Sequence, residues 1–188
     1  MEKIYRDADV SLKPLEGKVV AVIGYGIQGK AQAANARDSK VKVIVGTRPP
    51  EESPSRAQAK ADGFESMSIA EATKKADVLL IELADPAQPP IYKAEIAPNL
   101  SPGKTLCFCH GFNVLYGVIQ PPKDVNTVLF VPNAPGHFVR QKYLAGEGGL
   151  RLCGRRSRRH RQCHGHRPRR GQGRGQHPGR RCRDVVPA

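Results

Sequence analysis

The sequence predicts an α/β fold built on a doubly wound parallel sheet, followed by a disordered, arginine-rich tail. The first observation is a continuous apolar run at 19–23, which ends at a glycine-rich loop. The second is that further apolar runs alternate with helix-like segments as far as residue 149, which is the pattern of βαβ units with right-handed crossovers. The third is that this pattern stops after Gly149, where arginine becomes the dominant residue.

Five short apolar runs predict the strands, because uninterrupted runs suit strands that are buried on both faces of a sheet. They lie at 19–23, 41–45, 78–83, 105–109 and 128–131. Helices are predicted over 28–38, 57–62, 68–75 and 91–96. Ser68 and Glu71 have the spacing of a capping box at the start of one of these helices. The prolines and serines of 49–55 predict a loop.

The charge of the chain is unevenly distributed. Residues 151–188 hold 13 arginines and one acidic residue, whereas residues 1–150 hold 18 basic and 16 acidic residues. The basicity therefore belongs to the tail, and the body is an ordinary near-neutral domain. No apolar run reaches the ~18 residues of a membrane span, and the N-terminus does not resemble a signal peptide. Five cysteines without a disulfide framework lead us to expect a cytoplasmic protein.

Three glycines follow the first predicted strand with the spacing G-x-G-x-x-G: Gly24, Gly26 and Gly29. In a dinucleotide-binding loop, the first glycine permits the tight turn. The second lets the backbone approach a pyrophosphate, and the third lets helix and strand pack closely. The strand before the loop and the helix after it supply the context that this motif requires. The sequence therefore predicts a Rossmann-type cofactor domain over residues 1–149, with a purely structural glycine turn as the alternative.

The end of the second predicted strand indicates which dinucleotide is bound. An acidic residue there would bind the ribose 2′-hydroxyl of NAD, but this chain has Arg48. An arginine can pair with the 2′-phosphate of NADP, and Ser53 and Ser55 can donate hydrogen bonds to it. Glu51 and Glu52 lie close by and weigh against NADP. A solvated surface charge is the alternative interpretation of Arg48.

Several segments within residues 1–149 resemble those of the ketol-acid reductoisomerase family. They are Lys3-Ile4-Tyr5, the 24–29 loop, Arg37-Asp38-Ser39, Ile96-Ala97-Pro98-Asn99-Leu100, His110-Gly111-Phe112-Asn113 and Pro135-Gly136-His137. The last two are far more specific than a glycine loop. The resemblance implies NADPH as cofactor, two Mg²⁺ ions and a small acetohydroxy acid substrate such as 2-acetolactate. The family isomerises this substrate and reduces it to a 2,3-dihydroxy acid, in the synthesis of branched-chain amino acids.

The resemblance also implies which residues form the site. Those expected to line the cofactor are Gly24, Tyr25, Gly26, Ile27, Gln28, Gly29, Arg48, Ser53, Ser55, Asp85, Pro86, Ala87, Gln88 and Gly136. His110 matches the active-site histidine of the family. It also follows a predicted strand at the carboxyl end, where α/β proteins bind ligands, and a histidine there can shuttle protons near neutral pH. A hydrogen-bonded structural histidine is the alternative.

The chain departs from the family pattern at three places. Asn133 stands where the family carries an active-site lysine, and Lys30 stands where it often has histidine. The acidic metal ligands of the family lie in a helical C-terminal domain, which residues 150–188 do not resemble. We therefore expect no metal ligands in this chain and no turnover by it. The alternative function is a non-catalytic dinucleotide-binding module with a basic tail.

The tail at 150–188 has too few aliphatic residues to offset the entropy of ordering. Synonymous codons for residues 159–181, read one base later, encode a segment that resembles the family at this place. We therefore expect that the tail is the product of a frameshift near Gly149. Two other interpretations stay open. Arginine-rich segments bind nucleic acid nonspecifically, and the tail's cysteines and histidines can bind zinc, although without the spacing of a zinc finger.

Overall fold

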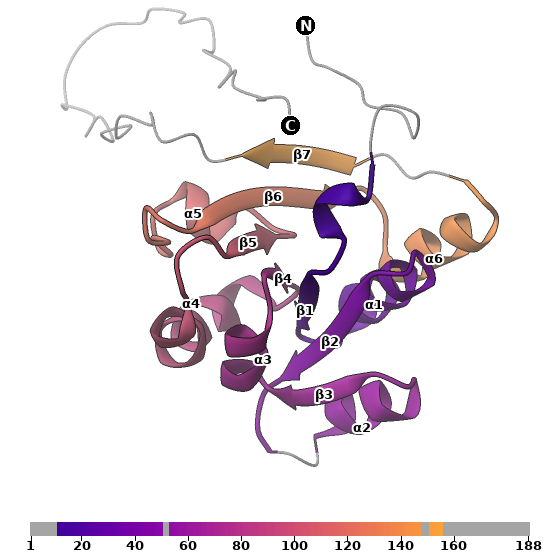
Figure 1. Ribbon diagram of the computed structural model, residues 1–188, viewed down its shortest axis with the longest axis horizontal. Helices are drawn as coiled ribbons and strands as arrows, with labels where there is room; N and C mark the ends of the chain where they lie inside the picture. Colours follow the sequence, from indigo (N-terminus) through magenta and orange to yellow (C-terminus); the bar gives the residue numbers. More distant parts are fainter. Residues whose placement is uncertain (1–10, 51–52, 148–150, 156–188) are drawn as a thin grey trace, which may run out of the picture.

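The computed structural model describes residues 11–50, 53–147 and 151–155, and only the backbone of the last segment. It contains one sheet with the strand order β3-β2-β1-β4-β5-β6-β7 (Figure 1). The strands are β1 (Val19–Ile23), β2 (Lys42–Thr47), β3 (Glu65–Ser68), β4 (Val78–Ile81), β5 (Thr105–Phe108), β6 (Asn126–Pro132) and β7 (Arg151–Arg155). The first six pair in parallel, as predicted, and β7 pairs antiparallel with β6.

Helices connect the strands and cover both faces of the sheet. The longer ones are α1 (Ile27–Asp38), α2 (Pro54–Ala61), α3 (Ile69–Lys75) and α6 (Gly136–Leu144). The short ones are η2 (Lys13–Leu15), η3 (Asp85–Ala87), α4 (Gln88–Ile91), the π-helix η4 (Tyr92–Ile96), η5 (Ala97–Asn99) and α5 (Phe112–Leu115). The described part of the chain contains no helix of the length and apolarity that crossing a membrane requires.

The strand order creates a switch point between β1 and β4. From β1 the sheet grows outward through β2 and β3, and from β4 it grows in the opposite direction through β5 and β6. In such doubly wound sheets, ligands bind outside the carboxyl ends of the strands at this point. The fold therefore places the loop at Gly24 and the segment after β4 at the edge where a ligand is expected.

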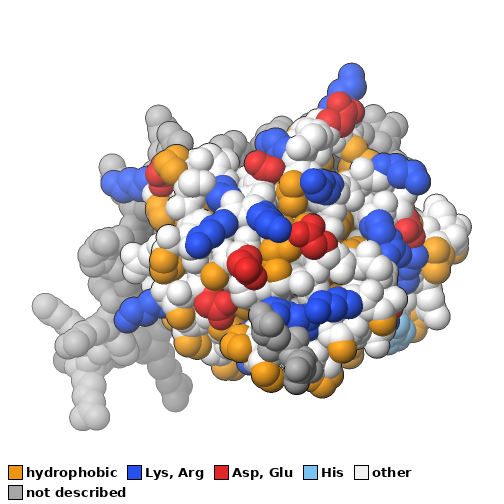
Figure 2. All heavy atoms as spheres, turned by 60° about the horizontal axis from the view of Figure 1, so that its bottom comes forward, with side chains coloured by type: hydrophobic (Ala, Val, Ile, Leu, Met, Phe, Trp, Pro, Cys, Tyr) orange, Lys and Arg blue, Asp and Glu red, His pale blue; other side chains and the backbone are white. Residues whose placement is uncertain are grey.

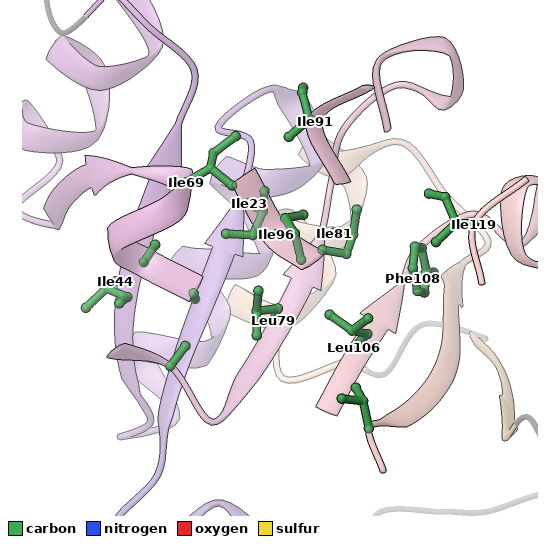
Figure 3. Packing of buried hydrophobic residues seen from close by; sticks show 14 of the residues in the cluster. Ile23, Ile44, Ile69, Leu79, Ile81, Ile91, Ile96, Leu106, Phe108 and Ile119 are labelled. Atoms are coloured by element: carbon green, nitrogen blue, oxygen red, sulfur yellow. The ribbon is translucent and has the colours of Figure 1, made fainter. Parts of the chain in front are cut away.

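Buried side chains form a core on each face of the sheet. On one face, Ile23, Leu79 and Phe108 pack with apolar residues from α3, α4 and η4 (Figure 3). On the other face, Val22 and Val45 pack against apolar residues from α1 and α2. Strands β1 and β2 therefore contribute buried side chains to both faces, which explains why their sequences are mostly apolar. On the surface shown in Figure 2, basic and acidic side chains are interspersed, in agreement with a near-neutral body.

The structure confirms the five predicted strands and the capping box, in which Ser68 accepts from the Glu71 N–H and the Glu71 carboxylate accepts from the Ser68 N–H. Among the elements that the sequence did not predict are β3, α5 and α6. The predicted loop at 49–55 is too long, because α2 already begins at Pro54 with Ser53 as its N-cap.

The prediction of an unstructured segment from residue 150 is wrong for 151–155. These residues form β7, which pairs with β6. The backbone of an edge strand offers unpaired N–H and C=O groups, and pairing with them does not require apolar side chains. Residues 156–188 lie outside the described part of the chain. The predictions of disorder, a frameshift product, nucleic-acid binding and zinc binding fall on them and remain predictions.

Candidate dinucleotide site

The loop after β1 turns tightly because its first glycine adopts a left-handed conformation. Gly24 has a φ of +97°, and a Cβ atom there would lie 3.1 Å from the Glu82 carbonyl oxygen. The Gly24 N–H donates to the Gly46 carbonyl at the end of β2, over 2.9 Å. An L-residue with a side chain would be strained in this conformation, so the glycine fixes the direction in which the chain leaves β1.

The other two glycines of the motif face different surroundings. A Cβ atom on Gly29 would lie 2.1 Å from the Gly24 carbonyl oxygen, so only glycine lets α1 pack this closely on the loop. A Cβ atom on Gly26 would meet nothing within 4 Å, so the outer side of the loop is open. Gly26 is the N-cap of the 12-residue helix α1 and provides no side-chain cap. Unpaired N–H groups and the helix dipole at an open helix start favour an anion such as a pyrophosphate.

The start of α6 packs against the same loop. A Cβ atom on Gly136 would lie 2.2 Å from the Ile27 carbonyl oxygen, and the Gln28 amide donates to the Ala134 carbonyl over 2.7 Å. Gly136 therefore lies at the loop, as expected. Its buried position allows two helix ends to approach each other, and it offers little surface to a ligand.

Arg48 directly follows β2, Ser53 is the N-cap of α2, and Ser55 lies in the first turn of α2. Arg48 and Ser55 are exposed. The Ser53 hydroxyl accepts from the Arg56 N–H over 3.4 Å and caps α2. Sequence reasoning missed Arg56, which is buried and donates from Nε to the Thr47 hydroxyl over 2.9 Å. This arginine ties the start of α2 to the end of β2, and its sequence context does not distinguish it from an exposed one.

A pocket of about 320 Å³ lies beside the loop, at the carboxyl ends of the central strands. Apolar side chains form most of its wall: Ile81, Leu83, Ala84, Val131 and Pro132. The polar residues that line it are Gln28, Glu82, Cys109 and His110. Sequence reasoning identified Gln28 and His110 and missed Glu82 and Cys109. The position of both directly after β4 and β5 was the signal that could have identified them.

His110 is held by an acidic partner. Its Nδ1 pairs with a carboxylate oxygen of Asp85, which begins η3 after β4. The imidazole is exposed, with 64% of its side-chain surface accessible. A carboxylate on Nδ1 orients the ring and favours the tautomer in which Nε2 can exchange a proton with a ligand. The structure thus brings together two residues of the predicted site from different strands.

Glu82 is a partly buried carboxyl group in the pocket wall. The Cys109 thiol donates to Glu82 Oε1 over 2.7 Å. Burial raises the pKa of Glu82 to about 7, although the hydrogen bond from Cys109 opposes this shift. Because withdrawal from water penalises the charged form, Glu82 exchanges its proton near neutral pH.

Two residues expected to line a cofactor turn their side chains inward. The Tyr25 hydroxyl donates to Asp62 over 2.8 Å and its ring packs against Phe64, so burial raises the pKa of Tyr25. Gln88 is 1% exposed and donates to the Leu83 carbonyl over 2.7 Å. The amide of Gln88 is thus already used inside the fold, and a contact between Gln88 and a cofactor stays a prediction. Tyr25 can reach a ligand only through its backbone.

The remaining expected residues lie on the surface near the loop and the pocket. Ile27 is 74% exposed at the start of α1, and Pro86 and Ala87 form η3 beside Asp85. Lys30, where the family often has histidine, forms an ion pair with Asp62 over 3.0 Å. Among the residues described, no three His, Cys, Asp or Glu side chains gather as metal ligands. The Mg²⁺ implied by the resemblance therefore finds no fitting site in this part of the chain.

Comparisons with known proteins show the family to which the chain belongs. Residues 14–164 match the family model "Acetohydroxy acid isomeroreductase, NADPH-binding domain". Two similar proteins are the ketol-acid reductoisomerases (NADP(+)) of Caldivirga maquilingensis and Pyrobaculum neutrophilum. Each is 51% identical over 148 residues, which cover 79% of this chain and 44% or 45% of the relative.

A solved structure is also similar, that of an NADH-preferring ketol-acid reductoisomerase from an uncultured archean. It has a TM-score of 0.79 and 43% identity, and the match covers 82% of this chain and 47% of that one. This chain thus spans less than half the length of the relatives that it matches. The match to the family model nevertheless covers most of the chain. The chain therefore belongs to the family of ketol-acid reductoisomerases, also called acetohydroxy acid isomeroreductases, through its NADPH-binding domain.

Proposed function

We propose that this domain binds NADPH and presents it to an acetohydroxy acid beside His110, as the cofactor-binding part of a ketol-acid reductoisomerase. One observation carries the proposal: the open loop around Gly26 adjoins a pocket that contains an oriented histidine. Phosphate-binding backbone and a proton-exchanging side chain are the two protein contributions that a nicotinamide-dependent reduction needs.

The residues present fit the parts of the cofactor. The backbone of Gly24–Gly29 and the start of α1 would hold the pyrophosphate. Arg48, Ser53 and Ser55 would hold the 2′-phosphate, because a guanidinium pairs with phosphate through two hydrogen bonds. The apolar walls of the pocket would take the nicotinamide ring. When bound, NADPH supplies the hydride for reduction.

His110 would supply the proton of the same reaction. Reduction of a ketone leaves a negative oxygen, which must be protonated to give an alcohol. The Asp85 carboxylate orients His110 for this transfer, and a positioned histidine is the commonest general acid in enzymes. The substrate class follows from the names of the relatives, and its isomerisation step is part of the proposal for the whole enzyme.

Calorimetric titration of the purified 188-residue chain tests the cofactor assignment. We expect NADPH to bind more tightly than NADH, because only NADPH carries the phosphate that Arg48 would contact. Arg48→Gln should weaken NADPH binding about tenfold, the effect of one lost charge-assisted contact of about 1.4 kcal/mol. Binding of NADH should not change, which serves as the internal control. Equal affinities of the wild type for the two dinucleotides would contradict the NADPH assignment.

A further inference from the structure

The pocket contains one acidic group to which the proposed reaction assigns no role. Glu82 follows β4, and its backbone N–H donates to the Ile23 carbonyl over 2.9 Å at the end of β1. The residue therefore sits at the switch point of the sheet, next to the phosphate loop. Its carboxyl group is the only acidic one among the described residues that line the pocket. Burying a carboxyl group costs free energy, so its position calls for an explanation.

The surroundings of Glu82 indicate what kind of ligand group it meets. The neighbouring walls are apolar, from Ile81, Leu83 and Val131. A flat ring can pack on such walls, and the pocket volume of about 320 Å³ accommodates one. One oxygen of the carboxyl group already accepts from Cys109, which fixes the orientation of the group. A ring that carries positive charge would find its counter-charge here.

We propose that Glu82 is the counter-charge for the nicotinamide ring and makes this pocket prefer the oxidised cofactor once the carboxyl group is ionised. The proposal rests on the proposed function, because it takes the pocket to be the nicotinamide site. The reduced ring is neutral, whereas the oxidised ring carries one positive charge. A carboxylate attracts that charge more strongly beside apolar walls than in bulk water. In its neutral form, Glu82 favours neither ring.

This preference depends on pH in a defined direction. Burial keeps a proton on Glu82 up to neutral pH, and a cation in the pocket would displace that proton. The other titratable groups of the pocket wall are Cys109, which donates to Glu82, and His110, which pairs with Asp85. A test must therefore separate Glu82 from His110.

The test is a set of calorimetric titrations of the full chain at pH 6 and pH 8. The ligands are NADP⁺, NADPH and 2′-phospho-ADP-ribose, which lacks the nicotinamide. For the wild type we expect the affinity ratio of NADP⁺ to NADPH to rise about tenfold between these pH values, as the ionised fraction of Glu82 rises. Both dinucleotides carry the same 2′-phosphate, so titration of that phosphate cancels in the ratio.

Three variants make the assignment specific. In Glu82→Gln the ratio should stay constant with pH, because the isosteric amide carries no charge. In His110→Gln the tenfold rise should persist. The control Glu65→Gln removes an exposed carboxylate on β3 that pairs with Lys75 at the end of α3. This variant should behave as the wild type. All variants should bind 2′-phospho-ADP-ribose as the wild type does, which shows that the phosphate site is intact.

Two results would overturn the inference alone: a pH-independent ratio in the wild type, or a rise that survives in Glu82→Gln. Failure of the wild type to bind any of the three ligands would instead refute the proposed function and the inference with it. If Glu82→Gln fails to bind 2′-phospho-ADP-ribose, the number of protons released by the wild type on binding each cofactor tests the inference instead. Wild-type titrations at pH 7 in two buffers of different ionisation enthalpy should show more protons released by NADP⁺ than by NADPH, in His110→Gln as well. Equal release would refute the inference.

Discussion

Two glycines of the phosphate loop, three residues apart, have opposite requirements. Gly29 faces the backbone of its own loop, with 2.1 Å between its notional Cβ atom and the Gly24 carbonyl oxygen. Gly26 faces open space. Gly29 is therefore needed for folding. Gly26 is needed for binding, because a phosphate can approach the backbone only where no side chain intervenes.

Alanine at each position separates these roles. Gly29→Ala should lower the free energy of unfolding by about 3 kcal/mol, the upper range for a side chain forced into packed structure. Gly26→Ala should lower it by less than about 1 kcal/mol, the usual loss at an N-cap, yet weaken NADPH binding at least tenfold. Urea denaturation and calorimetry measure the two effects. Equal destabilisation by both substitutions would refute the separation.

The carboxyl group of Glu82 should make stability depend on pH. Burial raises its pKa from 4.5 to about 7, so folding favours the protonated form. Its contribution to stability is fully present below about pH 4.5 and is lost as the pH rises through about 7. Between pH 4 and pH 8 the wild type should lose about 3 kcal/mol relative to Glu82→Gln. Urea denaturation at both pH values measures this, and a constant difference between the two proteins would contradict it.

At the scale of single residues, the sequence identified some site residues and not others. The glycine spacing and His110 could be identified because each has a fixed place relative to a strand end. Glu82 and Cys109 also follow strand ends, but the sequence does not reveal that these two ends bring their side chains within 2.7 Å of each other. The sequence likewise does not reveal that the Gln88 amide forms buried hydrogen bonds with Leu83 and Asn113.

At the scale of elements, the sequence predicted correctly a feature whose hydrogen bonds join residues close together in the chain. The capping box at the start of α3 joins Ser68 and Glu71, and both of its hydrogen bonds lie within four consecutive residues. Strand β3 was missed because its sequence, Glu-Ser-Met-Ser, has only one apolar residue. It forms because β2 offers it a parallel partner. Helix α6 likewise depends on its packing against α1, which joins residues about a hundred positions apart.

The capping box makes a measurable contribution to stability. Ser68→Ala removes the acceptor for the Glu71 N–H and the donor to the Glu71 carboxylate. The free energy of unfolding should fall by about 1 kcal/mol, the usual cost of losing an N-cap. Ser68→Thr keeps the hydroxyl and should recover most of it. A shift in the urea midpoint of Ser68→Ala no larger than that of Ser68→Thr would contradict this assignment.

At the scale of the whole molecule, the strand order unites the two halves of the site. The glycine loop follows β1 and the pocket residues follow β4 and β5, and these strands are neighbours in the sheet. The alternation of strands and helices was enough to predict a doubly wound parallel sheet, because right-handed crossovers leave few alternatives. Strand β7 could not be predicted, because only its pairing with the edge of β6 orders it.

Hydrogen–deuterium exchange of the full chain with and without NADPH tests the central claim that these halves form one dinucleotide site. We expect NADPH to slow exchange together in the 24–29 loop with the start of α1, and in the segments 82–85 and 109–112. 2′-Phospho-ADP-ribose should protect the first region and leave the pocket segments unchanged. Protection of the loop by NADPH without protection of the pocket segments, or no protection of the loop, would contradict the account.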